Sequence, residues 1–99
     1  MASKQVSLSV NDIPIELDYF VHDFIDHTVG GILAGLQDTG EIETLELSIE
    51  GDEVTINLNN AIVPIKPFVT KIIRNTVTGM ISPLKGVTDM NRVDISIKR

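Results

Sequence analysis

The chain has 99 residues, 42% of them hydrophobic, and contains neither cysteine nor tryptophan. This length suits one domain with a modest core, and the lack of cysteine excludes disulfides, thiolate metal sites and cysteine nucleophiles. The first residues show no apolar stretch typical of a signal peptide, and no apolar run reaches the ~18 residues that span a bilayer. We therefore expect one cytoplasmic domain over residues 1–99, without a membrane partner.

The sequence repeats itself at an offset of 48 residues. Residues 6–50 align with residues 54–98 without a gap, and ten aligned positions are identical, such as Phe20 and Phe68. Ordinary composition would give about three identities by chance. Many of the other aligned positions pair one apolar residue with another. We interpret the chain as two tandem copies of one unit.

Each unit opens with two short alternations of apolar and polar residues in opposite phase. In the first unit the phase changes across Asn11-Asp12. Asn and Asp tolerate the positive φ of a two-residue hairpin turn, so we expect a hairpin that pairs Val10 with Ile13. The second unit repeats this pattern around its own Asn pair. One long strand with a bulge at the Asn pair is the alternative.

A helix should follow each hairpin. Apolar residues recur at helical spacing from Phe20 to Leu36, after Asp18 as the candidate N-cap, and the second unit shows the same broad stripe. The predicted stripes include the phenylalanines, but aromatic residues are scarce, so we expect an aliphatic core of Val, Ile and Leu. Gly31 and its counterpart Gly79 flank the stripes, which suggests a close approach of the two helices.

Each unit closes with an alternating strand, at residues 45–49 and 93–97, and a polar turn at residues 50–53 joins the units. The predicted fold is therefore α+β, a two-layer sandwich with one mainly antiparallel sheet, two helices on one face and an internal ββαβ duplication. If each hairpin is instead one strand, the order becomes βαββαβ, a ferredoxin-like topology. The sequence does not fix the order of the strands in the sheet.

The net charge of −6 conceals two opposite halves. Residues 6–53 contain twelve acidic residues and no Lys or Arg, whereas residues 54–99 contain seven basic residues and two acidic ones. Three matched positions of the predicted helices carry opposite charges, and the last two pairs should face solvent at 100° per residue: Asp18 and Lys66, Asp23 and Lys71, and Asp26 and Arg74. These six residues are our candidates for self-association into a homodimer or larger assembly. Solvated surface without a partner is the alternative.

Both histidines lie in the first predicted helix, four residues from an acidic side chain. His22 and Asp26 can touch, as can Asp23 and His27, and a His–carboxylate pair can act as a general base or metal ligand. The histidines are about 140° apart on the helix, however, which does not suit a shared metal. We keep His22 and His27 as a candidate polar site, and we predict no catalytic residue, metal or cofactor.

The residues predicted for the outer sheet face include no aromatics and carry little positive charge. Proteins that read nucleic acids on a sheet need both, so we expect no nucleic-acid partner. The function we predict is a non-enzymatic domain that associates with itself and can also bind another protein. One alternative is a small-molecule or ion-binding domain with its site at the pseudo-twofold or dimer interface. Another is an enzyme that uses a His/Asp pair of the first helix.

Overall fold

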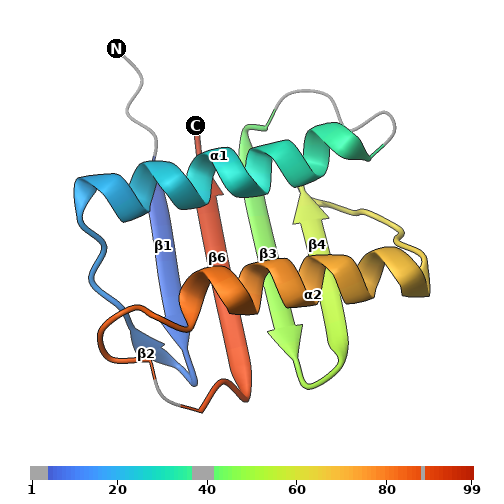
Figure 1. Cartoon of the computed structure of the whole chain (residues 1–99). Coiled ribbons are helices and arrows are strands. Elements are labelled where there is room, and N and C mark those ends of the chain that lie inside the picture. The colour runs from blue at the N-terminus through green and yellow to red at the C-terminus, as the bar shows by residue number, and fades with distance from the viewer. Residues whose placement is uncertain (1–4, 37–41, 88) are drawn as a thin grey trace.

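The computed structural model describes residues 5–36, 42–87 and 89–99, and its elements follow the predicted order ββαβ–ββαβ (Figure 1). The first half contains β1 (Gln5–Val10), β2 (Ile13–Pro14), α1 (Tyr19–Gly35) and β3 (Thr44–Glu50). The second half contains β4 (Glu53–Leu58), β5 (Ala61–Ile62), α2 (Pro67–Ile81) and β6 (Arg92–Lys98). Each strand of the second half lies 48 residues after its counterpart. An origin of the two halves by duplication stays a prediction.

The six strands form one antiparallel sheet in the order β2-β1-β6-β3-β4-β5. This order is unchanged when the two halves are exchanged and the sheet is read from the other edge. At its centre Leu47 of β3 lies opposite Ile95 of β6, so the pseudo-twofold axis passes between these two residues. The halves interleave, because β6 of the second half lies between β1 and β3 of the first. The long elements alone run β-α-β-β-α-β, so the alternative topology describes their succession as well.

The predicted hairpins are present, although β2 and β5 are only two residues long. Asn11 and Asp12 have φ angles of 53° and 65°, which a two-residue turn of this kind requires. Val10 pairs with Ile13 as predicted. The second hairpin has the same positive φ angles at its Asn pair.

Asn11 also connects its hairpin to the neighbouring strand. Its side-chain Oδ1 accepts hydrogen bonds from the backbone N–H groups of Asn91 and Arg92, at 2.9 Å each, where β6 begins. Asn59 does the same for Glu43 and Thr44 at the start of β3, at 2.8 and 3.0 Å. The identity of Asn11 and Asn59 therefore has a physical reason, since both residues set a turn and fix the start of a strand.

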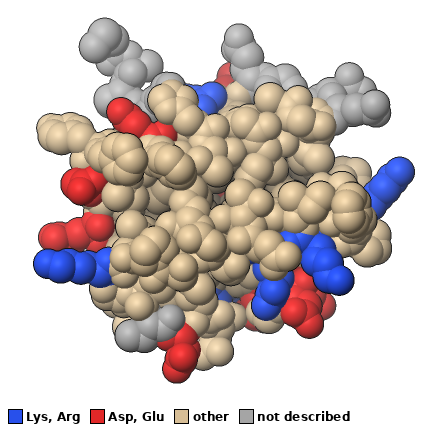
Figure 2. All heavy atoms as spheres, in the orientation of Figure 1, with Lys and Arg blue, Asp and Glu red and all other residues tan. Residues whose placement is uncertain are grey.

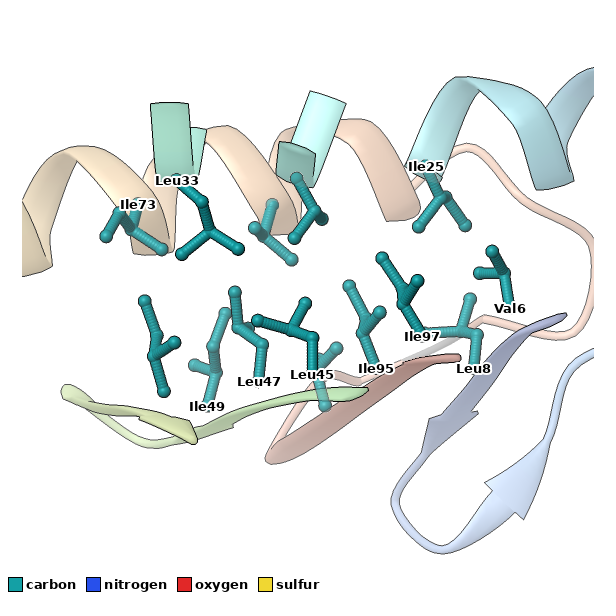
Figure 3. Packing of buried hydrophobic residues seen from close by; sticks show 14 of the residues in the cluster. Val6, Leu8, Ile25, Leu33, Leu45, Leu47, Ile49, Ile73, Ile95 and Ile97 are labelled. Atoms are coloured by element: carbon teal, nitrogen blue, oxygen red, sulfur yellow. The ribbon is translucent and has the colours of Figure 1, made fainter. Parts of the chain in front are cut away.

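The core lies between the sheet and the two helices, which cover one face of the sheet (Figures 1 and 3). It is aliphatic, and no aromatic residue is among the buried ones of the described chain. Each buried side chain of this kind stabilises the fold by about 1.5–3 kcal/mol. The inward residues of the helices and of the two central strands form its middle: Ile25, Val29, Leu33, Ile73, Val77, Ile81, Leu45, Leu47, Ile49, Val93, Ile95 and Ile97. Within the described residues, neither helix is long and apolar enough to cross a membrane.

Candidate functional site

The aromatic side chains of α1 lie on the side of the helix that faces away from the sheet. Phe20 is nine residues before the buried Val29, a rotation of 900°, which places it on the opposite side of the helix. Phe20 is 72% exposed, Phe24 is 47% exposed and Tyr19 is 92% exposed. The rings of Phe20 and Phe24 contact each other, with centroids 5.6 Å apart. The sequence assigns both phenylalanines to the apolar stripe of the helix, but their rings lie outside the core.

Helix α2 exposes the equivalent positions. Phe68 is 74% exposed and Ile72 is 48% exposed, and Phe68 lies nine residues before the buried Val77. We call the five residues Tyr19, Phe20, Phe24, Phe68 and Ile72 the helix patch. Exposed apolar groups of this size on neighbouring turns are typical of interaction surfaces.

The outer face of the helix layer carries few charges. Figure 2 shows this face with Lys, Arg, Asp and Glu gathered around the rim and uncharged residues in the middle. The two helices run in opposite directions across the face, so their aromatic first turns lie at opposite ends of it (Figure 1). An uncharged surface between charged margins resembles the core and rim of a protein interface.

Gly31, Gly35 and Gly79 also lie on this outer face and are exposed. A Cβ added at any of the three would meet nothing within 4 Å. The prediction that Gly31 and Gly79 bring α1 and α2 close together is therefore wrong. These glycines instead leave the outer face without side chains at their positions, on the same side of each helix as its exposed aromatic residues.

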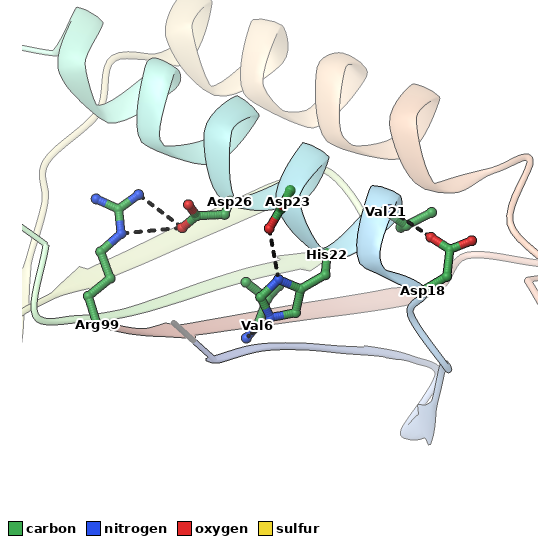
Figure 4. Close-up of polar contacts among 7 residues, drawn as sticks. All are labelled: Val6, Asp18, Val21, His22, Asp23, Asp26 and Arg99. Atoms are coloured by element: carbon green, nitrogen blue, oxygen red, sulfur yellow. Dashed lines mark hydrogen bonds and ion pairs between the residues drawn. The ribbon is translucent and has the colours of Figure 1, made fainter. Parts of the chain in front are cut away.

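The sequence predicts that Asp26 faces solvent. The structure shows instead that Asp26 is buried, with only 1% of it exposed. Its Oδ1 accepts hydrogen bonds from Arg99, from Nη2 at 2.9 Å and from Nε at 3.3 Å (Figure 4). The matched residue Arg74 donates through Nε to the backbone oxygen of Gly51 at 2.8 Å and approaches Asp52 at 3.6 Å. Both members of this predicted intermolecular pair therefore have partners within their own chain.

The other four charged candidates remain at the surface. Asp18 is the N-cap of α1, as predicted, and its Oδ1 accepts a hydrogen bond from the N–H of Val21 at 2.8 Å. Asp23 is exposed and lies 3.5 Å from His22. Lys66 precedes α2 without a side-chain capping bond, and Lys71 is exposed one turn further on.

The two predicted His–carboxylate pairs do not form. His22 Nε2 accepts a hydrogen bond from the backbone N–H of Val6 at 3.2 Å, and its Nδ1 faces Asp23 at 3.5 Å (Figure 4). Asp26 bonds to Arg99 instead of His22. His27 is exposed, and the described residues contain no group of three side chains placed to hold a metal ion. The geometry thus gives His22 a place beside the edge of the sheet.

The open face of the sheet is polar, and many of its polar groups bind one another. Ser48 Oγ donates to Asp94 Oδ1 at 2.7 Å, and Arg92 Nε donates to Asp94 Oδ2 at 3.0 Å. The hydrogen bond and the charge of Asp94 raise the pKa of the Arg92 guanidinium further above its ordinary value. Glu50 lies 3.3 Å from the same guanidinium. These hydrogen-bonded polar groups leave the open face hydrophilic.

Comparisons of the chain with protein-family models, with curated protein sequences and with solved structures found no match.

The helix patch is the feature that the sequence analysis did not predict. Its signal was available in the nine-residue spacing between Phe20 and Val29, which an apolar stripe of ordinary width cannot include.

Proposed function

We propose that the protein is a non-enzymatic interaction domain that associates with itself through the outer face of its helices. The observation that carries this proposal is the helix patch, in which five large apolar side chains are exposed on an uncharged face. The broad face of the molecule measures about 37 by 35 Å between Cα atoms. A face of this size is larger than the ~800 Å² that each partner buries in a standard interface.

The spacing of large and small residues favours a second copy as the partner. If two α1 helices pack antiparallel about a twofold axis between His27 and Thr28, Phe24 of one copy lies opposite Gly31 of the other. The same arrangement places Phe20 opposite Gly35. A ring can then occupy the space that the missing Cβ leaves.

The same axis also suits α2. Its equivalent centre lies between Asn75 and Thr76, which brings Ile72 opposite Gly79 and Phe68 opposite Pro83. One rotation thus pairs each aromatic end with a flat end on both helices. A partner of unrelated shape would not need this agreement, whereas an interface between identical copies does.

The charge-matched arrangement predicted from the sequence, α1 against α2 of a second copy, remains the alternative. It rests on Asp18, Asp23, Lys66 and Lys71, since Asp26 and Arg74 are engaged within the chain. The two arrangements differ in their response to salt. Screening at 1 M salt shortens the reach of charge to about 3 Å, so it weakens a charge-matched dimer. The same screening weakens the repulsion between two copies that each carry a net charge of −6, so a dimer held by the helix patch should not weaken in salt.

Sedimentation equilibrium at low salt and at 1 M salt tests the proposal. We expect a dimer that persists or tightens in salt. Phe24→Asp and Gly31→Leu should each weaken dimerisation at least a hundredfold, because one buries an unpaired charge and the other fills the space opposite Phe24. Ile62→Asp is the matched control, because Ile62 is 63% exposed but lies in β5, away from the helix face.

A monomer at all concentrations up to about 0.5 mM would contradict the proposal, since dimers of this class associate more tightly. So would dimerisation that Ile62→Asp weakens as much as Phe24→Asp does. A dimer that dissociates in salt and tolerates Gly31→Leu would support the charge-matched arrangement instead. The proposal includes the cytoplasm as the compartment of the protein. The chain has no cysteine, so it uses none of the disulfide chemistry of an oxidising compartment. Cell fractionation tests this location.

A further inference from the structure

The outer edge of β4 presents backbone groups that no strand of the described residues covers. Asn59 N–H donates to Thr44 O at 2.8 Å, so the odd-numbered residues of β4 bond to β3 and the even-numbered ones point away from it. Val63 N–H bonds to one of these, Ile56 O, at 2.9 Å. The chain then turns away at Pro64, and the next outward residue, Val54, faces none of the six described strands.

The equivalent edge in the first half is closed by a side chain. Val6 is the counterpart of Val54, and its N–H donates to His22 Nε2 at 3.2 Å. Position 70 in α2, the counterpart of His22, is a threonine. Within the described part of the chain, no group accepts the N–H of Val54. One exchange between His and Thr therefore closes one sheet edge and leaves the other open.

A groove lies beside the open edge. It is lined by Val54, Ile65, Pro67, Thr70, Lys71 and Arg74, and also by the acidic residues Asp52 and Glu53. Glu53 is an odd-numbered residue of β4, so its side chain lies on the open face of the sheet, opposite α2. Ile65 and Pro67 make part of it apolar. Arg74 is already bound to Gly51 and Asp52, whereas Lys71 is exposed and forms no ion pair with any described residue.

We propose that this edge takes an extended peptide of a partner protein, with a carboxylate side chain of the peptide next to Lys71. A peptide strand would pair with the outward N–H and C=O of Val54 as an added strand of the sheet. The ammonium group of Lys71 would select the acidic side chain, and Ile65 would contact an apolar side chain of the peptide. This surface lies beside the helix patch and does not depend on self-association.

A second copy does not fit the same edge. Two β4 edges paired about Val54 would bring Lys71 of one copy near Lys71 of the other, which costs free energy through like-charge repulsion. The β1 edge of a second copy cannot serve either, since His22 covers it. The charges and the capped edge therefore favour a separate acidic peptide.

Amide NMR titration with two blocked hexapeptides tests this site. The probes are acetyl-TVEVET-amide and its lysine analogue acetyl-TVKVKT-amide, each added to about 2 mM so that millimolar dissociation constants are detected. The glutamate peptide should shift the amide signals of Val54 and Lys71, and the lysine peptide should bind at least tenfold more weakly. Lys71→Glu should reverse that preference.

Exchanging the histidine between the two halves gives the matched variants. Thr70→His should cap the N–H of Val54, as His22 caps that of Val6, and weaken binding of the glutamate peptide at least tenfold. His22→Thr should open the first edge beside Asp23 and create a site that prefers the lysine peptide. Thermal unfolding checks that both variants fold, and Lys71→Glu decides the question if Thr70→His does not. The proposal is overturned if the Val54 amide does not shift, if both peptides bind wild type equally, or if Thr70→His folds and binds unchanged.

Discussion

Asp26 of α1 and Arg74 of α2 occupy equivalent positions but bind different groups. The Asp26 carboxylate is buried under α1, and Arg99 approaches it from the segment after β6 (Figure 4). The counterpart Arg74 reaches the residues after β3, which occupy the equivalent place in the second half. The charge at this position of the helix thus follows the residues at the end of the adjacent strand. Part of the opposite charge of the two halves therefore belongs to the fold itself.

Removing Arg99 should destabilise the protein more than removing Arg74. Arg99→Met leaves a buried carboxylate without its guanidinium, and we expect the free energy of unfolding to fall by about 3 kcal/mol, the lower end of the range for a broken buried pair. Arg74→Met is the matched control and should cost less than about 1 kcal/mol, because Asp52 is fully exposed. Urea unfolding of both variants provides the measurement. Equal losses would show that the burial of Asp26 contributes nothing.

The ion pair between Asp26 and Arg99 could not be predicted from the sequence. Asp26 and Arg99 are 73 positions apart in the chain. A charged residue in an amphipathic helix is therefore predicted to face solvent when no partner is evident in the sequence. The exposure of Phe24 could not be predicted for a related reason. Its apolar side chain satisfies the helical pattern equally well in a core and in an interface, since both remove it from water.

At the scale of single elements, local chemistry predicted most of the fold. The phase change at Asn11-Asp12 gave the hairpin and its register, and Asp18 gave the start of α1. These features depend on neighbours in the chain, which a sequence displays directly. The length of β2 did not follow, because Pro14 and the departure of the chain toward α1 end the pairing after two residues.

The hairpin of the first half offers a graded test of the two roles of Asn11. Asn11→Gly keeps the positive φ of the turn but removes the bonds to Asn91 and Arg92, which should cost about 1–3 kcal/mol for two hydrogen bonds. Asn11→Ala adds the strain of a left-handed conformation, about 1–2 kcal/mol more. Thermal and urea unfolding should rank wild type above Asn11→Gly and that above Asn11→Ala. An alanine variant as stable as the glycine variant would mean that the turn conformation carries no strain.

At the scale of the whole molecule, the order of the strands was the part that sequence could not supply. All four long strands have the same alternation and aliphatic composition, so each could pair with any other. The choice depends on the crossing of α1 and α2 over one face, which is a property of the assembled chain. The result is that each half completes the sheet of the other.

Neither half should therefore fold alone. A fragment of residues 1–52 lacks β6, which separates β1 from β3, and a fragment of residues 53–99 lacks the β3 strand between β4 and β6. We expect both fragments to be unfolded by circular dichroism when separate and to regain the helical signal when mixed in equal amounts, since their net charges of opposite sign favour association. A fragment that folds as a monomer by itself would contradict the interleaved sheet.

The place of β6 also has a consequence for protein synthesis. This strand comes last of the six in the chain, yet it pairs on both sides in the middle of the sheet. While a ribosome is still making it, β1 and β3 have emerged with their facing edges unpaired and their apolar sides uncovered. The sheet can close only when β6 leaves the exit tunnel, because the central pairings join residues far apart in the chain. Until that moment the nascent chain exposes unpaired, aggregation-prone strand edges. A chaperone that shields them would act before the seven-residue strand β6 appears.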